Sequence, residues 1–355
     1  MEKKKPRLLS GDTPTGRLHL GHWVGSVENR VLMQEDYDCY FLIANVQAFT
    51  TRMEKPAEVH QNVMDLMMDY LAVGIDPARS TLFLQSDIAA IAELTIFFSM
   101  LVSYPRVMRN PTIKDEIRDK GLGDNYPFGF LLYPVNQAAD ILAFRSEIIP
   151  VGEDQIPHLE LTREVARRFN QLYCHVDTHT DDADYVKKGG LFPIPAHKLG
   201  RSRRLVGIGS PAPDGNLLKM SKSLNNAIFL SDDPDAIKKK VMAMYTDPNR
   251  LKATDPGKVE NNPLWIFHET FNPDKAWVAQ AEERYREGTI GDVECKRQLI
   301  DVLVNLIEPI RTRRLQLEQD PHYVISVLKE GTARANEEAN HTLILAKEAM
   351  RQRYF

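Results

Sequence analysis

Hydrophobic positions in the first half of the chain alternate between short continuous runs and longer helical stripes. Residues 39–44 form an unbroken apolar run, which is typical of a strand buried on both faces. Between Pro56 and Gly74 apolar residues recur at helical spacing, which predicts a helix that begins near the proline and ends at the glycine. This alternation predicts an α/β fold with a doubly wound parallel sheet, and further strands are expected at 7–10, 81–84 and 148–151.

The pattern changes after about residue 173. The segment 177–215 is rich in Gly, Pro, Asp and basic residues and has no strong periodicity. From Ser231 onward the pattern is helical: acidic residues around Pro234 begin one helix, and a second carries an apolar stripe. A last helix is predicted over roughly 333–350. We therefore expect three parts: a first domain over 1–205, a mobile linker over 206–230, and an all-helical domain over 231–355 whose last helix is able to pack back on the first domain.

Composition narrows the class of protein. The 355 residues include 45 Lys and Arg against 49 Asp and Glu, a formal net charge of -4, and 43% are hydrophobic. These are ordinary globular values. They argue against a protein that holds nucleic acid by bulk positive charge, so a polynucleotide partner would have to meet local basic clusters.

The positions of the cysteines and the hydropathy of the chain bear on the cellular compartment of the protein. Cys39, Cys174 and Cys295 lie far apart, which excludes a disulfide framework or a four-cysteine zinc site and favours reduced thiols. No apolar run is long enough to span a membrane, and no apolar stretch follows the basic N-terminus as in a secretory signal. We therefore expect a cytoplasmic protein that does not contact a membrane.

The first candidate site is the turn Thr13-Pro14-Thr15-Gly16-Arg17-Leu18-His19-Leu20-Gly21-His22, called the signature turn below. It follows a strand and precedes a helix, whose N-terminus presents free N–H groups suited to phosphate. Gly21 permits close approach, and His19 and His22 can donate hydrogen bonds to phosphate oxygens. The alternatives are a polar turn whose histidines cap a helix, and a metal-binding pair that no neighbouring Cys or carboxylate completes.

The second candidate site is Lys219-Met220-Ser221-Lys222-Ser223, called the lysine loop below. Lysines neutralise phosphate charge, and hydroxyl and amide groups donate hydrogen bonds, so the loop can hold a triphosphate. Its alternative is a solvated basic loop. Together, the Pro-Thr-Gly-x-x-His-x-Gly-His turn and the Lys-Met-Ser-Lys-Ser loop resemble the paired signatures of class I aminoacyl-tRNA synthetases, in the tryptophanyl and tyrosyl branch.

A third segment, 133–142, bears on the amino acid. Tyr133, Gln137 and Asp140 can share one face of a helix that we expect Pro134 to begin. An ionised Asp only accepts hydrogen bonds and an indole only donates one, so Asp140 in an apolar pocket would match tryptophan. The alternative is an Asp on a solvent face. The stretch resembles the Tyr-Pro-x-x-x-Ala-Ala-Asp-Ile of tryptophanyl-tRNA synthetases, in which this Asp reads the indole nitrogen.

A fourth segment, 151–155, comes at a strand end, where doubly wound folds bind ligands. Asp154 can accept hydrogen bonds from ribose hydroxyls and Gln155 can reach the amino acid; the alternative is a strand-end turn in which Asp154 caps a helix. The segment matches the family's Val-Gly-Glu-Asp-Gln. The resemblance therefore assigns to ATP Thr13, Pro14, Thr15, Gly21, His22, Gly152, Glu153, Asp154, Leu205, Lys219, Met220, Ser221, Lys222 and Ser223, and to tryptophan Gly11, Tyr133, Gln137, Asp140 and Gln155.

The chain departs from the family pattern at several positions, which suggests a somewhat divergent bacterial-type form. Thr13 stands where many members have Gln, and His22 where they have Asn. Gln137 replaces a common Met, Gln47 a common His, and Val206 lies in a loosely matching stretch.

The resemblance implies a Rossmann-like nucleotide-binding domain followed by an anticodon-binding domain, in a homodimer. It implies that ATP, with Mg²⁺ on its phosphates and no dedicated protein cage, activates L-tryptophan for transfer to tRNA(Trp), with His19, His22, Lys219 and Lys222 as catalytic residues. A tyrosyl enzyme, a tRNA-independent adenylyltransferase and a non-catalytic paralogue remain as alternatives. Candidate basic clusters for tRNA are Lys187-Lys188, 201–204, 238–240 and 311–314.

Overall fold

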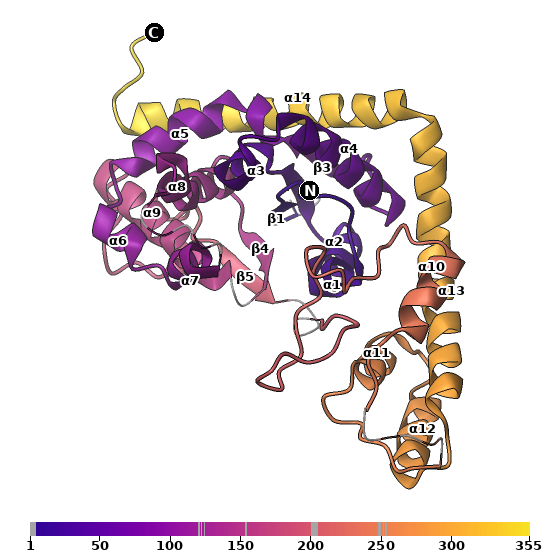
Figure 1. Ribbon diagram of the computed structural model, residues 1–355. Coiled ribbons are helices and arrows are strands. Elements are labelled where there is room, and N and C mark those ends of the chain that lie inside the picture. Colours follow the sequence, from indigo (N-terminus) through magenta and orange to yellow (C-terminus); the bar gives the residue numbers. More distant parts are fainter. Residues whose placement is uncertain are drawn as a thin grey trace.

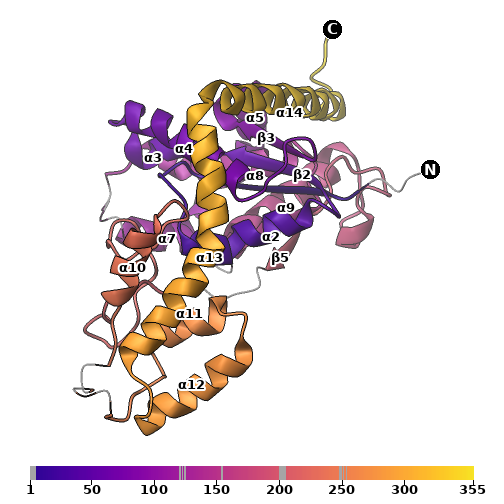
Figure 2. The same cartoon turned by 90° about the vertical axis from the view of Figure 1, so that its right-hand side faces the viewer.

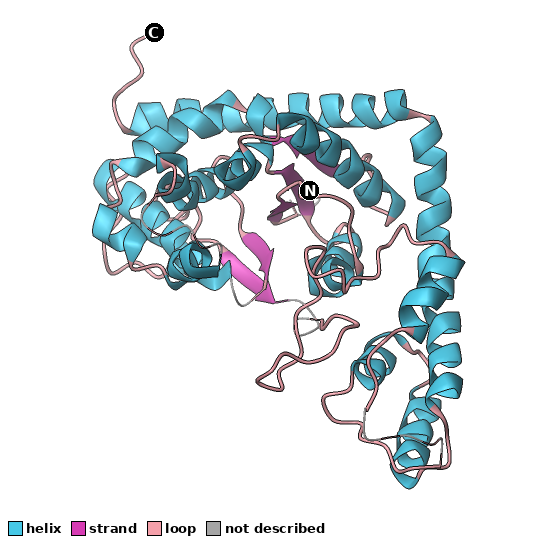
Figure 3. Ribbon diagram, viewed as in Figure 1, coloured by secondary structure: helices cyan, strands magenta, loops and turns pink. Residues whose placement is uncertain are grey.

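A five-stranded sheet with strand order β3-β2-β1-β4-β5 lies at the centre of the protein (Figure 3). All of its strand pairs are parallel, so the predicted doubly wound α/β fold is confirmed. The computed structural model describes residues 5–119, 121, 123, 125–152, 155–199, 205–247, 250, 252 and 254–355. The strands are β1 (Arg7–Asp12), β2 (Asp38–Ile43), β3 (Ser80–Leu84), β4 (Ile148–Val151) and β5 (Ala196–Leu199).

Four of these strands agree with the sequence pattern, and β5 was missed. It lies in the segment 177–215, which shows no strong periodicity. Its place is fixed by backbone pairing with β4, with Ala196 opposite Ile148. The four residues of β4 include the apolar run Ile148-Ile149, whereas β5 carries His197 and Lys198 in its middle, so no apolar run marks it and only the tertiary structure reveals this strand.

Successive side chains along each strand point to opposite faces of the sheet, and apolar side chains occur on both faces, so helices cover both. Leu8, Phe41 and Leu82 belong to one core cluster with residues of α4 and α13, whereas Leu9, Leu42 and Phe83 belong to another with α5, α8, α9 and α14. The helices up to β5 are α1 (Leu20–His22), α2 (Glu28–Met33), α3 (Asn45–Arg52), α4 (Pro56–Ala72), α5 (Ala89–Ser99), α6 (Tyr104–Met108), α7 (Pro111–Asp119), α8 (Phe128–Leu142) and α9 (Ile156–Tyr173), and Trp23–Val27 forms a π-helical turn between α1 and α2.

The start of α8 differs from the prediction that Pro134 would begin it. The helix begins at Phe128, and Pro134 lies inside it. Proline removes one helical N–H and disfavours a helix interior. Here the buried side chains of Phe130, Val135 and Ala138 hold α8 in the second core cluster, so packing overrides the local preference.

The C-terminal part of the chain is helical and runs back to the sheet (Figure 1). Figure 2 shows α13 as a long helix between α11 and α12 at one end and α14 at the other. In the chain α13 follows α12 directly, and it packs on both α4 and α10. The helices are α10 (Pro234–Met242), α11 (Pro263–Phe271), α12 (Lys275–Glu287), α13 (Asp292–Gln319) and α14 (Pro321–Ala349).

The last helix begins earlier than the predicted 333. Pro321 is its first residue, and the Asp320 side chain accepts a hydrogen bond from the N–H of Tyr323 at 3.0 Å. It lies along β3 and α5, where the Thr332 hydroxyl oxygen accepts a hydrogen bond from the Leu84 N–H at 3.1 Å. This helix therefore covers the β3 edge of the sheet.

Candidate active site

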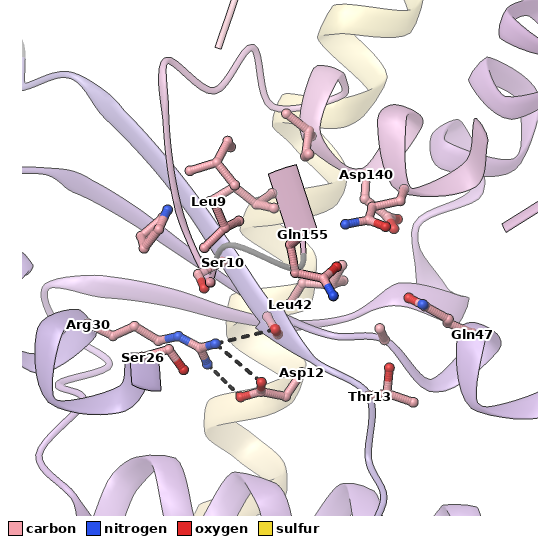
Figure 4. Close-up of a pocket in the computed structure, with 18 residues that line it drawn as sticks. Leu9, Ser10, Asp12, Thr13, Ser26, Arg30, Leu42, Gln47, Asp140 and Gln155 are labelled. Carbon is pink, nitrogen blue, oxygen red and sulfur yellow. Dashed lines mark hydrogen bonds and ion pairs between the residues drawn. The ribbon is translucent and has the colours of Figure 1, made fainter. Parts of the chain in front are cut away.

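A cavity of about 310 Å³ lies at the carboxyl ends of β1 and β4. The chain order of the sheet reverses between these two strands, and ligands of doubly wound folds bind at such a point. Figure 4 shows side chains from β1, β2, α3, α8 and the end of β4 around this cavity. The lining includes six residues predicted from the sequence, namely Gly11, Thr13, Gln137, Asp140, Gly152 and Gln155.

Asp140 lines the cavity from α8 and is only 2% exposed. Both of its carboxylate oxygens accept hydrogen bonds from Nε2 of Gln85, at 2.9 Å each. Burial raises the pKa of Asp140 to about 7, against the hydrogen bond from Gln85, which lowers it. The alternative of an Asp on a solvent face is thus excluded, and the carboxylate is placed to accept a hydrogen bond from a ligand.

Sequence analysis missed Gln85, which positions Asp140. Its Nε2 also donates to Oδ1 of Asn136 at 3.1 Å, and its Oε1 accepts from the N–H of Gln47 at 3.2 Å. Gln85 is buried and directly follows β3. Its place at the carboxyl end of a parallel strand is the signal that could have found it.

Tyr133 is buried and is not among the residues that line the cavity. Its hydroxyl lies 3.1 Å from Nε2 of His158, whose Nδ1 is 3.2 Å from Nδ2 of Asn110. All three side chains are buried. Burial raises the pKa of the Tyr133 hydroxyl, which therefore stays protonated.

A triad formed by the Arg30–Asp12 ion pair and the Tyr70 hydroxyl, at the end of β1, was also missed. Arg30 donates to both carboxylate oxygens of Asp12, at 2.6 and 3.2 Å, and Tyr70 donates to Asp12 at 2.6 Å. Burial raises the pKa of Asp12, but the attraction of Arg30 outweighs it and brings the pKa to about 2. The neighbouring Gly11 has no room for a side chain, because an added Cβ would lie 2.4 Å from the carbonyl oxygen of Leu42. The triad therefore fixes the strand end from which the signature turn departs.

The two histidines of the signature turn pack together, with ring centroids 3.7 Å apart. Nδ1 of His19 accepts from the N–H of Gly21, and Nδ1 of His22 accepts from the N–H of His19, both at 3.1 Å. Burial lowers the pKa of His19 to about 3 and that of His22 to about 4, so both rings are neutral at pH 7. Because Nδ1 accepts in each ring, the proton is assigned to Nε2, which is free to donate.

The lysine loop lies against the signature turn. Nζ of Lys222 is 3.5 Å from the hydroxyl oxygen of Thr15, and the buried Met220 receives the N–H of Gly21 on its sulfur at 3.3 Å. Burial lowers the pKa of Lys222 to about 8, partly offset by Asp69. The structure thus brings together the two motifs that the sequence pairs only by resemblance.

The remaining predicted residues lie around this junction. Pro14 is buried, Lys219 is exposed, and the Leu205 carbonyl accepts from the Met220 N–H at 3.1 Å. The hydroxyls of Ser221 and Ser223 are 2.9 Å apart. Glu153, Asp154 and the basic cluster 201–204 lie outside the described residues.

Two features of the described part of the chain bear on other classes of protein. No group of three or more His, Cys, Asp or Glu in this part of the chain could hold a metal ion. Within the same residues, no helix is long and apolar enough to cross a membrane.

Known proteins match the chain over nearly its whole length. The family model described as tRNA synthetases class I (W and Y) matches residues 1–308. The chain belongs to this family. The tryptophan–tRNA ligase of Streptococcus pneumoniae is 45% identical to this synthetase, over 99% of each chain, and that of Treponema pallidum is 47% identical, over 97% of this chain and 96% of its own.

Solved structures of synthetases also resemble this chain in fold. A tryptophanyl-tRNA synthetase from Campylobacter jejuni, complexed with ADP and tryptophan, aligns with a TM-score of 0.81 and 28% identity, over 97% of this chain and 99% of its own. A tyrosyl-tRNA synthetase from Archaeoglobus fulgidus aligns with a TM-score of 0.64 and 20% identity, over 88% of this chain and 91% of its own, which shows the shared fold alone.

Proposed function

We propose that this synthetase activates L-tryptophan with ATP and transfers the tryptophanyl group to tRNA(Trp). The observation that carries the proposal is the buried Asp140 carboxylate, held by Gln85 in a cavity that also reaches Gly11 and Thr13 beside the signature turn. The tryptophan–tRNA ligases that match this chain at 45–47% identity support the same amino acid.

Asp140 selects the side chain of the amino acid. An indole has one N–H donor and no acceptor, and a carboxylate is its matched partner in a dry pocket. A tyrosine side chain would present a hydroxyl that both donates and accepts. Gln137 and Gln155 line the same cavity and offer amide groups to the polar end of the substrate, and Gly11 lines it as well.

The reaction requires positioning and charge stabilisation more than covalent chemistry by the protein. A carboxylate oxygen of tryptophan attacks the α-phosphorus of ATP, and the bond from that phosphorus to the pyrophosphate oxygen breaks. Nε2–H of His19 and of His22 donates to phosphate oxygens, since Nδ1 of each neutral ring accepts from a backbone N–H and leaves the proton on Nε2. Lys219 and Lys222 hold the departing pyrophosphate, and Mg²⁺ enters on the ATP phosphates as part of the substrate.

The other predicted contacts to the nucleotide belong to the same proposal. The rest of the signature turn and of the lysine loop would surround the phosphates. Gly152, with Glu153 and Asp154, and Leu205 would hold the adenosine part, by the resemblance stated above. These assignments are testable one residue at a time in a pyrophosphate-exchange assay.

The decisive experiment is amino-acid-dependent exchange of pyrophosphate into ATP, measured with each of the twenty amino acids. Exchange with tryptophan alone, followed by charging of tRNA(Trp), is the expected result. Exchange with tyrosine would assign the chain to the tyrosyl alternative. Activation without charging of any tRNA would indicate an adenylyltransferase, and no exchange at all would indicate a non-catalytic paralogue.

The proposed parts of the molecule are a catalytic domain over 1–205, a linker that carries the lysine loop over 206–230, and an anticodon-binding helical domain over 231–355. Lys187-Lys188 and Lys238-Lys239 are the basic residues that we propose to meet tRNA, whereas Arg314 is buried and was wrongly included in such a cluster. Homodimerism is proposed from the family, and light scattering of the purified protein tests it.

A further inference from the structure

Arg314 in the helical part of the chain is 2% exposed and makes ion pairs with the first domain. Its NH1 donates to Oδ1 of Asp69 at 2.6 Å, and its NH2 donates to Oδ1 of Asp65 at 2.8 Å. Arg314 belongs to α13, and both carboxylates belong to α4. The contact therefore connects two segments far apart in sequence.

Asp69 passes this connection to the signature turn. While Oδ1 of Asp69 faces Arg314, Oδ2 accepts a hydrogen bond from the backbone N–H of Leu18 at 2.6 Å. Leu18 directly precedes His19. One carboxylate thus joins the guanidinium of α13 to the backbone that presents the two histidines.

The same backbone is held on its other side by the segment that follows the lysine loop. The Leu18 carbonyl accepts from the N–H of Leu230 at 3.0 Å, and the N–H of Leu20 donates to the Ile228 carbonyl at 2.9 Å. Leu18 and Leu20 are buried. The position of the turn is therefore set from two directions, by the Arg314–Asp69 pair and by the chain after the lysine loop.

Because Asp69 is buried, the charged state and the position of its carboxylate depend on Arg314. Burial raises the pKa of Asp69 to about 6, and Arg314 opposes this shift. A buried carboxylate that loses its ionic partner is expensive to keep in place. Without Arg314, Asp69 would rotate toward solvent or take up a proton, and its hydrogen bond to Leu18 would weaken.

We propose that Arg314 and Asp69 are positioning residues for adenylation, which place the Leu18 backbone and thereby His19 and His22 against the ATP phosphates. Neither residue lines the cavity, so their action is indirect. The proposal rests on the proposed function for its kinetic consequences, but the placement of the Leu18 amide can be measured without any activity.

The test compares Arg314→Met with Arg313→Met. Arg313 is a matched control because it also joins α13 to α4, by donating from Nε to the Ala72 carbonyl at 2.5 Å, whereas the Asp69 carboxylate pairs with Arg314. In full-length protein, Arg314→Met should lower kcat/KM for ATP in tryptophan-dependent pyrophosphate exchange by about tenfold to a hundredfold, with KM for tryptophan changed less than about twofold. Arg313→Met should leave both within about twofold, because pyrophosphate exchange does not involve the tRNA for which the cluster 311–314 was a candidate.

Hydrogen exchange of a peptide that spans 15–24 supplies the readout that does not depend on activity. Arg314→Met should speed exchange in this peptide and Arg313→Met should not. If wild-type protein shows no exchange of pyrophosphate, the proposed function fails while this measurement still decides the positioning role. Unchanged peptide exchange, or equal effects of the two substitutions, overturns the proposal.

A second set of variants tests the proposal if Arg314→Met fails to fold. In Asp69→Asn the amide oxygen can still accept from Leu18, but its NH₂ faces the guanidinium of Arg314. The double variant Asp69→Asn with Arg314→Gln restores a neutral donor–acceptor pair. We expect it to recover at least about threefold in kcat/KM for ATP over the single Asp69→Asn. Strictly additive losses contradict the proposal.

Discussion

At the scale of single residues, the site depends on groups whose charge is set by burial. Burial lowers the pKa of Lys222 to about 8, which still leaves it mostly protonated at pH 7 beside the neutral rings of His19 and His22. The turn therefore contributes hydrogen-bond donors, and the lysines contribute the positive charge. Each of these contributions can be removed separately.

The first prediction concerns Lys222. Lys222→Ala should lower the rate of tryptophan-dependent pyrophosphate exchange by about 10²–10³-fold, as is typical when one contact to developing charge is lost. Lys329→Ala, which removes an exposed lysine from α14, is the matched control and should leave the rate unchanged. An unaltered rate in Lys222→Ala would remove this residue from the mechanism.

The second prediction concerns Asp140 and pH. Asp140→Ala should raise KM for tryptophan by about tenfold to a hundredfold, because a buried charged acceptor is lost, and should change KM for ATP far less. In wild type, protonation of Asp140 as the pH falls below about 7 removes the negative charge, so tryptophan binding should weaken toward low pH. Titrations of tryptophan binding between about pH 5 and 8 should show this slope in wild type and none in Asp140→Ala. Equal losses for both substrates would make Asp140 structural.

At the scale of elements, α14 packs directly on β3 of the sheet, and α13 packs on α4, which covers one face of the sheet. Gly331 of α14 approaches β3 so closely that an added Cβ would lie 1.9 Å from the Leu82 carbonyl oxygen. Farther along the helix, Glu338 accepts from Arg7 and Arg145, at 2.6 Å each. The C-terminal helix is thus part of the core that supports the strand ends.

The third prediction follows from that close contact. Gly331→Ala should destabilise the protein by about 1–3 kcal/mol, because the helix must move away from β3. Gly129→Ala in α8 is the control: it is exposed, nothing lies within 4 Å of its added Cβ, and it should be neutral or slightly stabilising. Denaturant unfolding of both variants measures the free energy of unfolding. A value for Gly331→Ala equal to that of the wild type would contradict the close packing of α14 on β3.

At the scale of the whole molecule, the net charge of -4 has to be reconciled with a tRNA partner. Arg314, one of the arginines that raised the local basic charge, is used inside the protein, and Lys240 is paired with Asp232 at 2.6 Å. The basic surface left for tRNA is therefore smaller than the sequence suggests. We therefore expect only a few contacts to tRNA phosphates, each at a defined position.

The fourth prediction is a salt dependence confined to the tRNA step. Raising salt from about 50 to about 200 mM should raise KM for tRNA several-fold, since each phosphate contact releases counterions. Pyrophosphate exchange, which involves no tRNA, should change much less under the same conditions. A charging reaction insensitive to salt would exclude phosphate contacts as a main source of tRNA affinity.

The sequence by itself determined the parallel sheet, most of its strands and the side-chain chemistry available at the candidate site. Apolar runs and helical stripes are local patterns, and motifs such as 219–223 keep their residue types within a few positions, so both are legible without coordinates. The buried state of Asp140 was also foreseeable, because Ala138, Ala139, Ile141 and Leu142 surround it in sequence.

Only the tertiary structure decided which distant groups support that chemistry. Gln85 reaches Asp140 from another element, and Arg314 reaches Asp69 from the far end of the chain. A four-residue strand such as β5 and a proline inside α8 are likewise settled by packing and pairing with remote residues. Local patterns carry no information about such contacts, because their energy comes from burial and from charges that meet only in the folded chain.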